Sequence, residues 1–143
     1  MSAKTKIVEV DGARYQLRKL RPNVGSYILT RMLAAGVSSG SLGSTPKDSM
    51  LMAVFGAFLR GLDFDTFSFI QNNCLAVVGV MKQAGDGNEV PMPLASDSGV
   101  FAYPEVADNL PLVMNLTVQS LMFNLSDFFE EGGLRTVVAA ATA

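Results

Sequence analysis

The chain has 143 residues, of which 49% are apolar and only 17% are charged, and its mean hydropathy is +0.30. A chain of this length suits one domain, with a core that needs neither disulfides nor a structural metal. Histidine is absent and Cys74 is the single cysteine. These counts exclude a disulfide framework, a thiolate metal cluster and the usual histidine general base.

The net charge of −2 conceals an uneven distribution along the chain. Residues 1–31 carry seven basic and two acidic groups, whereas residues 83–143 carry one basic and eight acidic groups. Two interpretations are open: the two ends lie together and offset each other, or they align copies of the protein head to tail.

We expect a cytosolic protein with no membrane segment. The opening residues MSAKTKIVEV lack the apolar stretch of a signal peptide. Of the two longest apolar runs, residues 50–59 are too few to span a bilayer and residues 110–129 contain several polar side chains.

The first elements are a hairpin and a helix. Residues 6–20 predict a β-hairpin, because β-prone residues flank Asp11-Gly12, a pair typical of tight turns. Pro22 suits the first turn of a helix over residues 22–35, which Gly36 and the Ser/Gly-rich residues 38–44 end.

Helices are predicted for most of the remainder. Thr45 and Pro46 open a second helix that is apolar most of the way round, and Asp65 is expected to cap a third helix that continues to about Lys82. We expect residues 84–99 to form a loop, because Pro91 and Pro93 break regular structure. The sequence does not decide whether this segment folds as a hairpin. A last helical region opens near residue 104 and continues over 110–129, with Asn109 as a cap before Pro111.

The predicted fold class is therefore α+β but mainly α, with an N-terminal β-hairpin followed by about four helices. We expect a single domain over residues 1–131, with the hairpin at 6–20 and the helical part at 22–131, and a flexible tail at 132–143.

One short motif matches a catalytic pattern. Asp63-Phe64-Asp65 fits the two aspartates of the D-x-D-x-T string of phosphatases with an aspartate nucleophile, although Thr66 follows one position too early. That chemistry needs a parallel strand in a larger α/β sheet, whereas this motif lies between two predicted helices. We therefore expect no enzyme, no cofactor and no metal.

Four basic residues on and after the second predicted strand suggest an alternative function, nucleic-acid binding. Phosphates would suit the cluster formed by Arg14, Arg18, Lys19 and Arg21, but the pI of about 5.0 and the lack of interleaved exposed aromatic residues argue against it.

The opening KIVEVDGARYQLRKLRPNVGSYILTRML, with its strand, Asp-Gly turn, strand and helix, resembles the tail assembly chaperones of long-tailed bacteriophages. The resemblance implies a non-enzymatic chaperone in the host cytoplasm that binds the tape measure protein. It would keep this protein soluble, promote polymerisation of the tail tube around it, and then be absent from the mature virion. It also implies that many members have a longer, frameshifted form. A structural virion component, such as a tail completion or connector protein, is the alternative.

Apolar helix faces rich in Met and Phe would suit such a client, although ordinary core packing explains the same pattern. Besides the tape measure protein, the tail tube protein and self-association are open partners; nucleic acid and membrane are not expected. The residues that we expect to contact a partner are Tyr15, Arg18, Arg21, Met50, Met52, Phe55, Phe58, Met114, Leu121, Met122, Phe123, Phe128 and Phe129.

Overall fold

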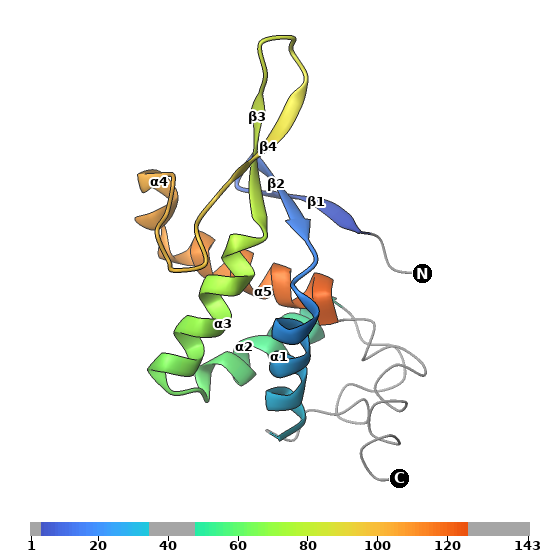
Figure 1. Ribbon diagram of the computed structural model, residues 1–143, viewed down its shortest axis with the longest axis vertical. Coiled ribbons are helices and arrows are strands. Elements are labelled where there is room, and N and C mark those ends of the chain that lie inside the picture. The colour runs from blue at the N-terminus through green and yellow to red at the C-terminus, as the bar shows by residue number, and fades with distance from the viewer. Residues whose placement is uncertain (1–3, 35–47, 126–143) are drawn as a thin grey trace.

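The computed structural model describes residues 4–34 and 48–125. For residues 48–52 it describes the backbone but not the side chains. In chain order its elements are β1 (Thr5–Val10), β2 (Ala13–Arg18), α1 (Pro22–Ala34), α2 (Asp48–Arg60), α3 (Phe64–Ala76), β3 (Val78–Gln83), β4 (Glu89–Pro93), α4 (Pro104–Ala107) and α5 (Leu110–Leu125). Figure 1 shows the strands at one end of the molecule and α1, α2 and α3 at the other, with α5 between them.

The N-terminal hairpin is confirmed. β1 and β2 pair antiparallel with Val10 opposite Ala13, so Asp11 and Gly12 alone form the turn. Both turn residues have positive φ, 52° and 83°. A two-residue turn of this kind needs positive φ at both central positions, which Asp and Gly adopt at little cost.

The prediction of a mainly α fold is wrong. The hairpin is half of a four-stranded antiparallel sheet with strand order β1-β2-β3-β4. The expected third helix ends at Ala76, and the residues up to Gln83 form β3 instead. Val77, Val78 and Val80 fit the period of a helix and that of a strand. The free side of β2 decides between them, because Tyr15 and Leu17 pair with Val80 and Val78.

The residues after β3 are also more regular than the loop that we expected. β4 pairs antiparallel with β3, from Gln83 opposite Glu89 to Gly79 opposite Pro93. Pro91 and Pro93 do not prevent this because β4 lies at the edge of the sheet, where a strand can lack N–H donors on its outer side. Figure 1 shows the β3–β4 hairpin projecting away from the helices.

The helix boundaries agree with the sequence at some ends and not at others. α1 begins at Pro22 as predicted. α3 begins two residues earlier than expected, because Asp63 rather than Asp65 is its N-cap: the Asp63 carboxylate accepts from the Thr66 N–H at 3.1 Å. Asn109 does cap α5, since its Oδ1 accepts from the Leu112 N–H at 3.2 Å. The expected cap Thr45 lies outside the described residues.

α5 is the centre of the molecule, because it contributes to both hydrophobic clusters. Its first half packs Leu112, Val113 and Leu116 against the sheet. Its second half packs Val118, Leu121, Met122 and Leu125 against α1, α2 and α3. The two apolar stripes of this helix therefore bury against two different partners within the same chain.

Candidate partner-binding site

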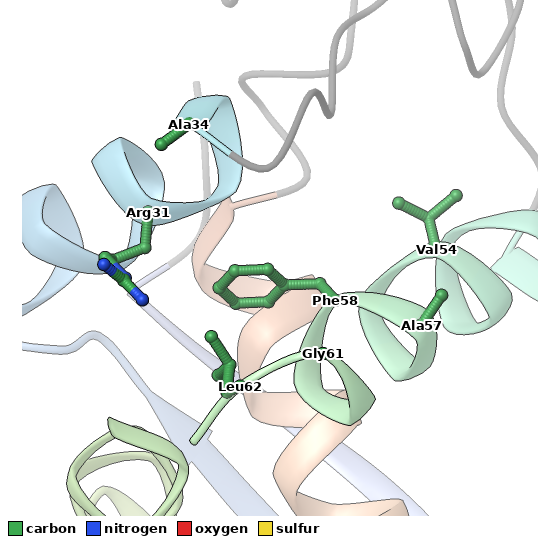
Figure 2. A pocket seen from close by; sticks show the side chains of 7 residues that line it. All are labelled: Arg31, Ala34, Val54, Ala57, Phe58, Gly61 and Leu62. Atoms are coloured by element: carbon green, nitrogen blue, oxygen red, sulfur yellow. The ribbon is translucent and has the colours of Figure 1, made fainter. Parts of the chain in front are cut away.

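An open pocket between α1 and α2 is the candidate site, and we call it the α1–α2 groove (Figure 2). It has a volume of about 540 Å³. Its lining is apolar or small except for one charged side chain, and consists of Arg31, Ala34, Val54, Ala57, Phe58, Gly61 and Leu62. Three other pockets lined by described residues are smaller, with volumes of about 280, 280 and 90 Å³.

Small residues on two helices create the groove. Ala57 lies in the last turn of α2 and Gly61 follows the helix directly, so both border the groove on the same side. On the opposite wall, Ala34 at the end of α1 likewise contributes little side-chain volume. Figure 2 shows Phe58 extending from α2 toward α1, with Leu62 beside it. The result is an apolar floor, since Phe58 is buried, beneath walls that carry little side-chain volume.

Arg31 supplies the charge of the groove. The side chain is exposed, and its guanidinium lies close enough to Asp63 to contribute to that carboxyl's lowered pKa. The larger cause of the lowered pKa is the hydrogen bond from Thr66, which favours the ionised carboxylate. Because its side chain is exposed, Arg31 can also meet an anionic or carbonyl group that enters the groove.

The apolar surface continues along α1. Tyr27 lies one turn before Arg31 on the same helix face. Its ring meets Phe69 of α3 edge to face, with centroids 5.4 Å apart, and both side chains are about two-fifths exposed (40% and 44%). Exposed aromatic pairs next to a groove are typical of surfaces that bind another polypeptide.

Of the residues predicted to contact a partner, Phe58 alone lines the groove among those whose side chains are described. The hydrophobic cluster between α5 and the helices α1, α2 and α3 contains Phe55, Leu121 and Met122, and Met114 packs against it. The cluster between α5 and the sheet contains Tyr15, and Phe123 packs against it. The side chains of Met50, Met52, Phe128 and Phe129 lie outside the described residues. A partner role for any of these residues stays a prediction.

The predicted basic residues have contacts within the chain. Arg18 donates to the carbonyl of Ala76, the last residue of α3, and Lys19 donates to the carbonyl of Phe123 near the end of α5. Lys19 also lies 4.3 Å above the ring of Phe123. Arg21 donates to Asn73 of α3. Arg18 and Lys19 thus satisfy backbone carbonyls near the C-terminal ends of helices, where positive charge is favourable, whereas Arg21 bonds the side-chain oxygen of Asn73.

Sequence reasoning missed most of the groove. Val54 and Leu62 belong to the apolar stripe of the second helix, but Arg31, Ala34, Ala57 and Gly61 gave no signal as single residues. The one signal that could have pointed to it is the spacing of Ala57 and Gly61, which places two small residues one helical turn apart.

The motif at Asp63–Thr66 has no catalytic geometry. Asp63 caps α3 and Asp65 is exposed in its first turn. The strands of the described sheet are all antiparallel, so no parallel strand presents this motif. Nor do three or more Cys, Asp or Glu side chains converge on a metal position within residues 4–34 and 48–125.

Fold and site together define a small α+β protein with an apolar groove that suits another polypeptide rather than a small substrate. Residues 11–135 match the family model described as phage tail assembly chaperone protein, TAC. The chain therefore belongs to the phage tail assembly chaperone family, which confirms the resemblance of its opening residues. No curated protein and no solved structure matches it.

Members of this family are phage assembly factors that interact with tail proteins, and the family is generally non-enzymatic. None of the helices in the described part of the chain has both the length and the apolar character needed to cross a bilayer.

Proposed function

We propose that this protein binds the tape measure protein of its phage through the α1–α2 groove, keeps it soluble and promotes tail tube polymerisation around it. The observation that carries the proposal is an apolar groove between two helices in a protein of the tail assembly chaperone family. On this proposal the protein acts without catalysis in the host cytoplasm and is absent from the mature virion.

The shape of the groove favours a helical segment as the occupant. Helices bind such grooves by inserting apolar side chains spaced three or four residues apart, and small wall residues let the two backbones approach. A volume of about 540 Å³ accommodates a few such side chains. Arg31 at the wall would pair with an acidic residue on the polar side of the same client helix.

The direct test is coexpression with the tape measure protein encoded by the same phage. The wild-type chaperone should keep the client in the soluble fraction and copurify with it. Ala57→Lys places a charged side chain in the groove at an exposed helical position, so the chaperone should fold and lose at least about tenfold in affinity. Ala107→Lys makes the same change on exposed α4, outside the groove, and should bind like the wild type.

Two results would contradict the proposal. If the client stays insoluble with the wild-type protein, the protein is not its chaperone. If Ala57→Lys and Ala107→Lys hold the client equally well, the client binds elsewhere. Mass spectrometry of purified virions separates the alternative, a tail completion or connector subunit, because such a subunit would be present in stoichiometric amount.

A further inference from the structure

The two edges of the sheet differ in the hydrogen bonds that they offer. In β4 the backbone of even-numbered residues faces β3, as the hydrogen bond from the Leu94 N–H to the Val78 carbonyl at 3.1 Å shows. Residues 91 and 93 therefore direct their backbone outward, and both are prolines without an N–H. This edge cannot donate to a further strand at either position.

β1, at the opposite edge, has a strand on one side only within the described sheet. The Arg18 N–H donates to the Val77 carbonyl at 3.1 Å, so the even-numbered residues of β2 bond β3 and its odd-numbered residues bond β1. Their partners in β1 are Lys6, Val8 and Val10. The N–H and C=O groups of Thr5, Ile7 and Glu9 consequently point outward, and no other strand of the described sheet pairs with them.

The charges of β1 favour one kind of strand as its partner. Lys4 and Lys6 lie at the start of the strand, and Glu9 and Asp11 at its end. A second β1 in antiparallel orientation brings the basic start of each strand to the acidic end of the other. Lys6 and Glu9 lie on opposite faces of the sheet, so the attraction is between the strand ends and not between directly opposed side chains. A parallel copy would instead place lysine beside lysine, which is unfavourable.

Antiparallel pairing about Ile7 also matches the outward groups. The register with Ile7 opposite itself places Thr5 opposite Glu9, because the two residues lie equally far from Ile7 on either side. All three outward residues then form hydrogen-bonded pairs, and the two Ile7 side chains, each 40% exposed, meet at the twofold axis.

We infer that β1 is a self-association edge: a second copy of this chain pairs with it antiparallel about Ile7, joining two four-stranded sheets into one. Assembly ends at the dimer, because the proline edge of β4 does not extend it. A six-residue strand buries little area, so the dimer is weak and its population rises with protein concentration.

Sedimentation velocity from roughly 10 µM to 1 mM tests the inference in the purified protein without client. The wild type should pass from monomer toward dimer across this range. Ile7→Pro removes only an outward N–H, as Pro91 and Pro93 do in β4, so it should keep the monomer fold and weaken dimerisation at least about tenfold. Ile7→Lys should weaken it as well, by placing like charges at the twofold axis. Met92→Lys is the matched control, since Met92 is 44% exposed in β4, and should dimerise like the wild type.

Amide hydrogen exchange locates the interface. The amides of Thr5, Ile7 and Glu9 should exchange freely at low concentration and become protected at high concentration. Those of Lys6, Val8 and Val10 should be protected at both.

Three outcomes overturn the inference: a wild type that stays monomeric throughout the range, a dimer whose newly protected amides lie elsewhere, or a folded Ile7→Pro that dimerises normally. Circular dichroism establishes folding. If Ile7→Pro is unfolded, Ile7→Lys decides alone, and normal dimerisation of that variant rejects the inference. None of these outcomes bears on client binding in the groove, which depends on other residues.

Discussion

The side chain of Asn124 connects three parts of the fold, and its removal should be among the most destabilising polar substitutions. Its Oδ1 accepts from the Leu20 N–H at 2.7 Å, between β2 and α1. Its Nδ2 donates to the carbonyls of Arg18 at 3.2 Å and Ser120 at 2.9 Å. One amide therefore fastens the start of α1 and the end of β2 to α5.

The expected cost of Asn124→Ala follows from these contacts. A neutral hydrogen bond contributes about 1 kcal/mol net, and a buried N–H left without an acceptor costs about 1–3 kcal/mol. Leu20 is buried, with 9% exposure, so water restores its hydrogen bond poorly. Because the three bonds are not additive, we expect the free energy of unfolding to fall by about 2–4 kcal/mol.

Urea unfolding followed by circular dichroism measures this change. With a slope of about 2 kcal/mol per molar, the midpoint should fall by about 1–2 M while the slope stays constant. Gln119→Ala is the control, because it truncates an amide of the same helix that has no hydrogen bond to the described residues, and should change stability by less than about 0.5 kcal/mol. A midpoint for Asn124→Ala that matches this control would refute the reasoning.

Three further substitutions test the interior. Burial raises the pKa of the Cys74 thiol from 9.0 to about 12. As the pH rises, the thiol therefore ionises first in the unfolded chain, and above pH 9 the free energy of unfolding falls by up to about 1.4 kcal/mol per pH unit. Urea midpoints measured from about pH 8 to 10 should fall less steeply for Cys74→Ala than for the wild type. Equal slopes would contradict this assignment. A Cβ on Gly79 would lie 2.9 Å from the Pro91 Cβ, so Gly79→Ala should cost about 1–3 kcal/mol by thermal unfolding, and an unchanged midpoint would disprove that close approach. The Asn115 Oδ1 is buried with no hydrogen-bond donor among the described residues, so Asn115→Leu should stabilise the protein by about 1 kcal/mol in urea titration, and marked destabilisation would reveal a missing partner.

The hairpin turn and several helix starts were predictable because their causes are local. Asp11-Gly12 needs positive φ at two consecutive positions, and Pro22 and Asn109 act on the first turn of the helix that follows them. Such preferences act within a few residues and survive in almost any tertiary context. The family resemblance came from the same segment for this reason.

The groove could not be predicted in the same way. Its walls come from α1 and α2, and Ala34 and Ala57 become informative only when the two helices stand opposite each other. The Met- and Phe-rich stripes suggested a client surface, but part of them lies in the hydrophobic core of the chain itself, because Phe55 and Leu121 are fully buried. An apolar stripe specifies that a helix face will be covered, but the covering element may belong to the same chain.

By itself, then, the amino-acid sequence determined an N-terminal hairpin, several helix starts, a chain without histidine chemistry, and the family. The tertiary structure alone decided that residues 78–83 and 89–93 are strands, that α5 is covered on two sides, and that the apolar opening lies between α1 and α2. The physical reason is the range of the interactions. Turns and caps depend on neighbours in sequence, whereas β3 forms because the free side of β2 needs a partner some sixty residues away (Tyr15 pairs with Val80).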